Sequence, residues 1–378
     1  MSSQKIYYAN LRGIPVEERE DRITNLRNYK YVAVDKSILS NYVLNRLWER
    51  AVNLFPAWLA PNLITVFGFL FIVFACLLNV YYDYEMLGVA PSFVYYNNAL
   101  CLFIYMMFDA VDGKQARRTK SGSPLGQLFD HGIDSVVATL SVIMFASAMG
   151  LGRSLESFLF LASSKHVFYF VGFEEYFTHA FVLGHVNGPT EGILSGILVF
   201  LISAVFKPSC WSWVLQYDLS SYVSNISLLG FFFVIVVPIC GAISSIRNMK
   251  TGDKLTILLH MLVPSIFYIC FYIYLRQIKN TFNYYVLLLT EALNFFILVL
   301  EMNYAHLTRS EIPIAWPSVT LFVFGVYFTY RNIYLYGLFV ISLISSCLIA
   351  WCISNEICDI LHIKCFTISN EEVKNKKC

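Results

Sequence analysis

The sequence predicts an all-α polytopic membrane protein with about ten transmembrane helices and an N-terminal amphipathic helix at the membrane interface. Of its 378 residues, 57% are hydrophobic and only 14% are charged, whereas a soluble domain carries about 25% charged residues. Apolar segments recur along the chain, and a helix needs about 20 such residues to cross a bilayer. The net charge of +2 is far from the strongly basic charge that is typical of a nucleic-acid-binding protein.

The N-terminal region is polar and precedes the first apolar segment. Residues 1–34 lack the apolar core of a cleavable signal peptide, so we expect a cytoplasmic tail. Residues 35–60 contain an amphipathic pattern that is typical of a helix lying in the membrane interface, with a soluble packing helix as the alternative. The apolar positions on one face are Leu39, Tyr42, Val43, Leu47 and Ala51.

Long apolar segments follow, and we expect each of them to span the membrane. They cover residues 62–82, 93–111, 126–149, 155–174, 190–206, 225–246, 254–275, 281–302, 315–331 and 333–355. Cytoplasmic loops carry an excess of Lys and Arg. We place the N-terminus in the cytoplasm, because the main basic segments then lie on the same side of the membrane. These segments are residues 114–120, 247–254, 306–309 and 374–377.

The ten cysteines are scattered and form no C-x-x-C pair. Zinc and redox motifs place cysteines at short, regular spacings. We therefore interpret these cysteines as small hydrophobic residues of the core.

The segment from Asp109 to Asp134 contains four aspartates where one apolar segment ends and another begins. Asp109 and Asp112 share one helical face, as do Asp130 and Asp134 on the next helix. A short loop joins the helices, so an antiparallel pair would bring the four carboxylates together. Carboxylates at the edge of a membrane require a metal ion or another positive charge that compensates them. Oxygen ligands suit Mg²⁺ or Mn²⁺, and two ions about 3.5–4 Å apart would favour phosphoryl displacement.

Small and basic residues accompany these aspartates. Gly113, Ala116 and Gly126 remove side-chain bulk beside the carboxylates, so a ligand could approach the backbone. Close packing between membrane helices is the alternative for such small residues. Arg117 carries a guanidinium whose fork geometry suits a phosphate, whereas Arg118 is interpreted as a cytoplasmic anchor.

Together these positions read D-x-x-D-G-x-x-A-R-x8-G-x-x-x-D-x-x-x-D, which resembles the signature of the CDP-alcohol phosphotransferase family. Other stretches resemble its eukaryotic choline/ethanolamine phosphotransferase branch; they are Tyr29–Ser37, Ala60–Thr65, Glu174–Thr178, Asn187–Gly192 and Ala305–Arg309. The resemblance implies a helical homodimer with its active site at the cytoplasmic end of the early helices. Residues 61–206 would form the catalytic part, with the motif at 109–134. Residues 207–357 would form further membrane helices, and residues 358–378 a cytoplasmic tail.

The implied reaction transfers phosphocholine or phosphoethanolamine from CDP-choline or CDP-ethanolamine to diacylglycerol and releases CMP. Asp109, Asp112, Asp130 and Asp134 would bind two Mg²⁺ or Mn²⁺ ions, and the small residues and Arg117 would bind substrate. His131 is the expected general base, since an imidazole titrates near pH 6.5, with Asp134 as its rival. The resemblance also suggests that Glu191 orients His131 and that Asn62 contacts the nucleotide. Helix capping is the alternative for Asn62.

Other residues allow weaker predictions. Phe173, Tyr176 or Phe177 could surround a quaternary ammonium, although core packing is the alternative, and His306 is expected to be structural. Lys374 and Lys376 resemble a dilysine retrieval signal, which favours the endoplasmic reticulum, with the Golgi as the alternative. Competing interpretations are a family member with another lipid or alcohol acceptor, a transporter with carboxylates near the bilayer centre, and an inactive scaffold.

Overall fold

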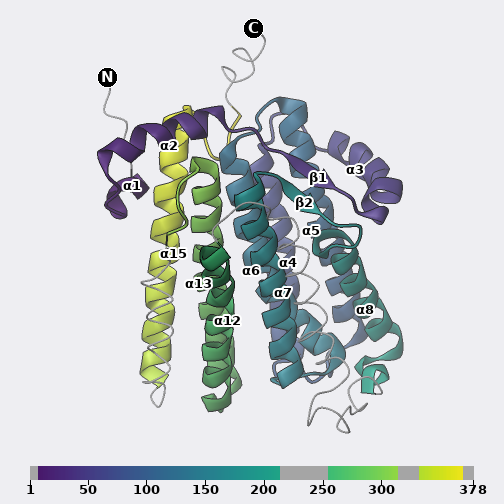
Figure 1. Ribbon diagram of the computed structural model, residues 1–378. Helices are drawn as coiled ribbons and strands as arrows, with labels where there is room; N and C mark the ends of the chain where they lie inside the picture. Colours follow the sequence, from purple (N-terminus) through teal and green to yellow (C-terminus); the bar gives the residue numbers. More distant parts are fainter. Residues whose placement is uncertain (1–6, 213–253, 314–331, 369–378) are drawn as a thin grey trace.

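The computed structural model describes residues 7–212, 254–313 and 332–368. Its long helices run side by side as a bundle (Figure 1). These helices are α4 (Pro61–Tyr82), α5 (Ser92–Thr119), α6 (Pro124–Met149), α7 (Leu155–Thr178), α8 (Ile193–Phe206), α12 (Lys254–Gln277), α13 (Thr281–Thr308) and α15 (Asn332–Leu361). The predicted spans at residues 225–246 and 315–331 lie outside the described residues.

Six helices in the described part of the chain are long and apolar enough to cross a membrane, so the predicted number of about ten spans is not confirmed. They comprise α4, α5, α6, α13, residues Gly188–Phe206 and residues Ile333–Leu361. Helices α7 and α12 form where spans were predicted. Glu174 and Glu175, close to the C-terminal end of α7, are buried inside the protein. Such acids in a membrane protein usually face the bundle interior.

The turn between α5 and α6 has clear stereochemical causes. Lys120 ends α5 in the left-handed conformation, with a φ of 56°, and Ser121 N donates to Ala116 O at 3.0 Å. Pro124 begins α6, where its fixed φ suits the first helical turn and its missing N–H costs nothing. The turn therefore spans only a few residues, and the two helices leave it as neighbours.

Close packing fixes the position of α6 inside the bundle. A Cβ atom added to Gly132 would lie 3.0 Å from Phe296 on α13, so the glycine allows these helices to approach each other. Gly68 has the same role between α4 and α5, where an added Cβ would lie 3.1 Å from Phe108. Helices α6 and α13 are largely buried, whereas α15 is mostly exposed.

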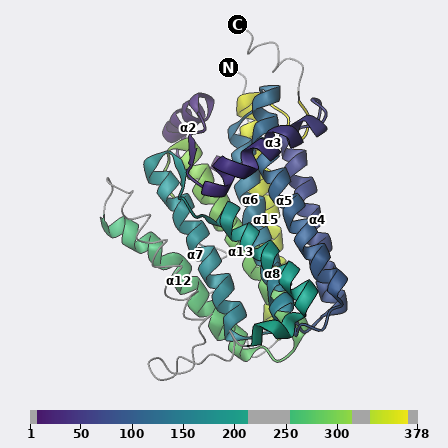
Figure 2. The ribbon, with the colours of Figure 1, turned by 90° about the vertical axis from the view of Figure 1, so that its right-hand side faces the viewer.

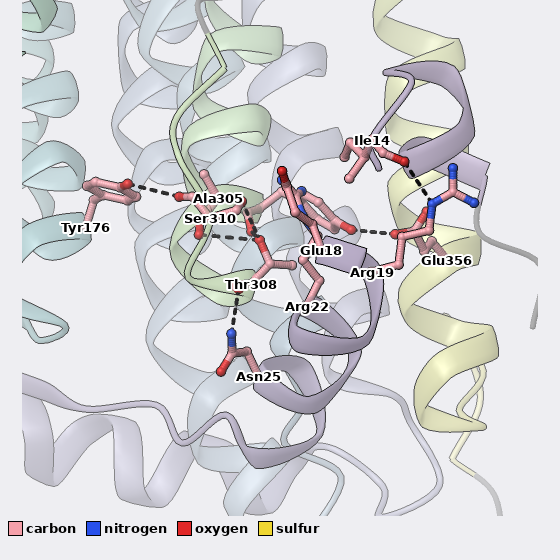
Figure 3. Close-up of polar contacts among 11 residues, drawn as sticks. Ile14, Glu18, Arg19, Arg22, Asn25, Tyr176, Ala305, Thr308, Ser310 and Glu356 are labelled. Carbon is pink, nitrogen blue, oxygen red and sulfur yellow. Dashed lines mark hydrogen bonds and ion pairs between the residues drawn. The ribbon is translucent and has the colours of Figure 1, made fainter. Parts of the chain in front are cut away.

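The N-terminal region is docked on the bundle rather than extending from it as a tail. Helices α1 (Tyr7–Leu11) and α2 (Val16–Asn28) cross the end of the bundle at which α13 and α15 end (Figure 1). Asn25 Nδ2 donates to the Thr308 carbonyl at 2.9 Å (Figure 3). Arg12 pairs with the buried Glu301, and Glu356 accepts hydrogen bonds from the first residues of α1.

A short parallel sheet modifies the all-α prediction. β1 (Ala33–Asp35) pairs with β2 (Phe181–Leu183), and Ala33 aligns with Phe181. Three-residue strands leave little periodicity in the sequence, so the pattern of residues could not reveal them. The sheet ties the N-terminal region to the segment that follows α7.

A helical segment forms where the interfacial helix was predicted, and it has an exposed apolar face. It comprises the π-helix Ser40–Leu44, α3 (Asn45–Ala51) and the 3-10 turn Val52–Leu54, and it lies at the same end of the bundle, against α5 (Figure 2). Tyr42 and Val43 are 77% and 59% exposed, while Trp48 is buried against Met106. This exposed apolar face is what a membrane-interface helix requires.

A buried ion pair links several helices of the bundle close to the aspartate motif. Lys165 Nζ lies 3.7 Å from Glu291 Oε1 and donates to the Ser135 carbonyl at 2.5 Å. Thr139 and Tyr268 donate to the same glutamate at 2.8 and 2.7 Å. Four helices, α6, α7, α12 and α13, therefore meet at one polar cluster.

We expect Glu291→Gln to destabilise the protein strongly, because it leaves a buried ammonium without its charged partner; removing one member of a buried pair costs roughly 3–5 kcal/mol. Denaturant unfolding in mixed micelles would measure the change. The control is Glu18→Gln, which removes the α2 pair between the exposed Glu18 carboxylate and Arg22 and should cost about 1 kcal/mol or less, because water still solvates the glutamate side of the pair. Equal losses from both substitutions would contradict a role for the buried pair.

Candidate active site

The α5–α6 pair brings the predicted aspartates together. Asp109, Asp130 and Asp134 each offer a carboxylate oxygen, and these oxygens lie within 4.8 Å of one another. Among the described residues, Asp112 is not part of this group of three. Its Oδ2 accepts a hydrogen bond of 2.5 Å from the Thr65 hydroxyl of α4. The structure thus supports one compact set of three carboxylates, with the fourth beside it.

These carboxylates fit a divalent cation. Tyr105 donates a hydrogen bond to Asp134, but Asp130 Oδ1 is buried and has no hydrogen-bond partner. Buried polar atoms in native proteins nearly always have a partner, and close carboxylates need a positive charge between them. An all-oxygen set suits Mg²⁺ or Mn²⁺ better than softer metals.

Two glycines of the motif are not required by helix packing. An added Cβ at Gly126 would lie 3.7 Å from Asn62 Oδ1, and one at Gly113 would lie 3.7 Å from Arg117 Nη1. Both are ordinary van der Waals distances, unlike the 3.0 Å contact at Gly132. Close helix packing therefore does not require glycine at either motif position, which is compatible with the predicted ligand approach.

The two adjacent arginines have different environments. Arg118 Nη1 donates to the carbonyls of Val52 and Phe55 at 3.0 and 2.9 Å, so this side chain holds the end of the interfacial segment. Arg117 is exposed and lies beside Gly113. The structure leaves the Arg117 guanidinium available to an anion near the carboxylates.

His131 is buried beside the aspartates, and Asn303 of α13 holds its imidazole. His131 Nδ1 lies 3.2 Å from Asn303 Oδ1. If Nδ1–H donates to that amide oxygen, Nε2 keeps its lone pair and can accept a proton. The ring also packs against Phe181 of β2, with centroids 5.1 Å apart.

The prediction that Glu191 orients His131 is not supported by the contacts. The Glu191 carboxylate accepts from Ser37 Oγ at 2.6 Å and from Asn187 N at 3.0 Å, so it fastens the N-terminal segment to the start of the next helix. The acid near His131 is Glu175, whose Oε2 lies 4.0 Å from His131 Nδ1. Glu175 lies in the Glu174–Thr178 stretch of the family resemblance, but it meets His131 only because α7 packs against α6, so spacing along the chain could not identify the contact.

A chain of polar contacts joins Glu175 to the N-terminal segment. Gln127 Nε2 donates to Glu175 Oε1 at 2.6 Å, and the Tyr29 hydroxyl donates to Gln127 Oε1. Burial, followed by the nearby charges of Asp130 and Glu175, raises the pKa of the Tyr31 phenol above its usual range. Tyr29 and Tyr31 therefore bring the N-terminal segment over the aspartates and Glu175.

The aromatic residues proposed for the head group have other partners. Phe173 is fully buried in the core and stacks on Tyr169, and the Tyr176 hydroxyl donates to the Ser310 carbonyl at 2.9 Å (Figure 3). Phe177 packs edge-on against Phe173. Because these side chains contact other parts of the protein, their aromatic character alone does not indicate a binding site.

Asn62 lies in the first turn of α4 beside Gly126, as a nucleotide contact would require, but its amide nitrogen already donates a hydrogen bond within the protein. Asn62 Nδ2 donates to the Cys365 carbonyl at 2.8 Å. Phe366 packs edge-on against Phe129, with centroids 5.5 Å apart. The segment after α15 thus lies against the α4–α6 end of the site. Helix capping, the alternative role for Asn62, is not observed, because Ala60 is the cap residue of α4 and Asn62 lies inside the helix.

The chain is similar to a known protein family and to several named relatives. The family model described as CDP-alcohol phosphatidyltransferase matches residues 58–215. The chain is 37% identical to Choline/ethanolaminephosphotransferase 1 of Saccharomyces cerevisiae over 61% of this chain and 60% of that relative. It is 36% identical to Choline/ethanolaminephosphotransferase 2 of Arabidopsis thaliana over 75% of this chain and 77% of that relative. It is 33% identical to Cholinephosphotransferase 1 of Saccharomyces cerevisiae over 78% and 80% of the two chains.

We expect Mg²⁺ or Mn²⁺ to raise the Tm of chelator-treated protein, because a cation relieves repulsion among the carboxylates. A ligand at 100 times its Kd stabilises a protein by about 2.7 kcal/mol. Thermal unfolding in detergent would measure the shift. Asp130→Asn should reduce it strongly, whereas Asp21→Asn, at an exposed position of α2, should preserve it. An equal shift in both variants would place the cation elsewhere.

Proposed function

The chain belongs to the CDP-alcohol phosphatidyltransferase family, and from this premise we propose that it transfers phosphocholine or phosphoethanolamine from the CDP-alcohol to diacylglycerol. The products would be CMP and phosphatidylcholine or phosphatidylethanolamine. The observation that carries the proposal is the complete eight-position motif, whose aspartates on α5 and α6 bring three carboxylate oxygens within 4.8 Å of one another. Relatives named for choline and ethanolamine transfer support the choice of head group.

Asp109, Asp130 and Asp134 would hold one divalent cation, and Asp112 would contribute to a second. Cations held by these residues would supply positive charge to offset the charge of the pyrophosphate. Thr65 fixes the Asp112 carboxylate through its hydrogen bond, and Tyr105 fixes that of Asp134. Because the carboxylates are oriented before substrate arrives, little reorganisation is needed during the reaction.

Arg117 would bind the pyrophosphate from the exposed side of the site. Its guanidinium can donate two parallel hydrogen bonds to phosphate oxygens. Because Gly113 and Gly126 carry no side chains, a nucleotide would be able to lie close to the backbone of α5 and α6 there. This placement would set the head-group phosphorus near the carboxylates and His131.

His131 would act as the general base. The diacylglycerol hydroxyl oxygen forms a bond to the phosphorus of the head group, the bond from that phosphorus to the CMP oxygen breaks, and the hydroxyl proton passes to His131 Nε2. Asn303 holds the ring through Nδ1. Asp134 is the poorer candidate, because a carboxylate that binds a cation has a weaker affinity for protons.

The membrane setting of the reaction is part of the proposal. The helices α5 and α6 meet at the end of the bundle that bears the interfacial helix and the N-terminal helices (Figure 1). We assign this end to the cytoplasm, where CDP-alcohols are soluble, and the membrane to the endoplasmic reticulum. A homodimer is also proposed, on the family resemblance.

We expect purified protein with diacylglycerol and Mg²⁺ to release CMP from CDP-choline, from CDP-ethanolamine or from both. Asp134→Ala and His131→Ala should abolish the release, because one removes a cation ligand and the other removes the proton acceptor. Donors are supplied separately in detergent or liposomes, and CMP is quantified by chromatography. A folded wild-type preparation without turnover of either donor would contradict the proposed function.

The two arginines provide a matched pair of variants. Arg117→Gln should raise the KM for the CDP-alcohol about 10- to 100-fold, because hydrogen bonds to charged groups contribute about 1.5–3 kcal/mol, and leave the Tm unchanged. Arg118→Gln should lower the Tm and leave that KM nearly unchanged, because Arg118 binds backbone carbonyls. Steady-state kinetics and thermal unfolding separate the two effects. The opposite pattern would exchange the roles of the arginines.

A further inference from the structure

One of the two carboxylate oxygens of Glu175 lacks a hydrogen-bond partner in the part of the protein that the structure describes. The residue is 2% exposed, and its Oε1 accepts from Gln127 Nε2 at 2.6 Å. Its Oε2 is buried and has no hydrogen-bond partner. An unsatisfied buried oxygen on a charged group is costly, so this position requires a ligand or a positive charge.

The neighbouring side chains do not supply that charge. His131 Nδ1 and His306 Nε2 lie 4.0 and 3.6 Å from the carboxylate, beyond hydrogen-bond distance. His131 Nδ1 is already engaged with Asn303. Among the described residues, no lysine or arginine forms an ion pair with Glu175. The carboxylate therefore accepts no hydrogen bond from His131 or His306 and has no lysine or arginine partner among the described residues.

Two further unpartnered atoms belong to the residues that surround Glu175. Asn303 Nδ2 and His306 Nδ1 are both buried and lack hydrogen-bond partners. Aromatic rings accompany them, because Tyr29 packs edge-on against His306 and Phe181 packs against His131. A carboxylate together with aromatic rings is the chemistry that binds an organic ammonium.

We propose that Glu175 is the counter-charge for the cationic head group of the CDP-alcohol. This inference rests on the proposed function and assigns the head-group end of the donor to the region between Glu175 and His131. His131 directly follows the predicted cation ligand Asp130, and its Nδ1 lies 4.0 Å from Glu175 Oε2. The cation site and the ammonium site are thus adjacent, as a short phosphoalcohol requires.

The two head groups differ in how they can use this site. A primary ammonium donates hydrogen bonds to the carboxylate as well as neutralising it, whereas a quaternary ammonium offers charge and methyl groups alone. Ethanolamine should therefore depend on Glu175 more strongly than choline does.

The test compares CDP-ethanolamine, CDP-choline and CDP-3,3-dimethylbutanol, the uncharged carbon analogue of the choline donor. Wild-type protein should prefer both charged donors. Glu175→Gln should raise the KM for CDP-ethanolamine about tenfold or more, the size expected for loss of a charge-assisted hydrogen bond. It should raise the KM for CDP-choline by a smaller factor and leave the KM for the neutral donor nearly unchanged. Glu175→Asp, which keeps the charge on a shorter side chain, should be intermediate.

Glu301→Gln is the matched control, because Glu301 is also buried at this end of the bundle but pairs with Arg12. It should change the kinetics with all three donors by the same factor. If Glu175→Gln lowers kcat equally with all three donors and leaves KM unchanged, Glu175 acts through His131 and the proposal is wrong.

The wild-type protein gives a second test that does not depend on the folding of any variant. Equal KM values for the charged and neutral donors would contradict the Glu175 proposal alone. Release of CMP from none of the three donors would contradict the proposed function and, with it, this inference.

Discussion

The structure depends on the cost of placing several carboxylates together at the edge of an apolar helix bundle. Asp109, Asp130 and Asp134 offer oxygens within 4.8 Å of one another, and such charges repel unless a cation lies among them. The rigid turn between α5 and α6 and the close contact of Gly132 with α13 hold these helices in place. The fold therefore maintains an arrangement that is unfavourable unless a positive charge lies among the carboxylates.

The segments outside the bundle complete the site. The N-terminal region reaches it through Tyr29 and Tyr31, and the β1–β2 pairing holds that region in register with Phe181. From the other end of the chain, Cys365 binds Asn62. Segments that are far apart in the sequence thus enclose the groups that would contact substrate, and they do so at the end of the bundle where a soluble nucleotide could enter.

Much of this arrangement could be predicted from the sequence, because its causes are local. The periodic spacing of the aspartates and the length of the apolar segments follow from helix geometry. The partner of His131 could not be predicted in this way, and the prediction of about ten spans stays unconfirmed by the described residues. Glu175 and Asn303 meet His131 only after α7 and α13 pack against α6. Glu191, which lies in a stretch of the family resemblance, instead binds Ser37.

The most direct test of the account is a high-resolution cryo-electron microscopy map of the protein with Mg²⁺ and CDP-choline or CDP-ethanolamine. The account predicts cation density between Asp109, Asp130 and Asp134, with the pyrophosphate beside Arg117 and the head-group end directed toward Glu175. A nucleotide bound away from the α5–α6 turn, or a bound nucleotide without a cation among these carboxylates, would contradict it.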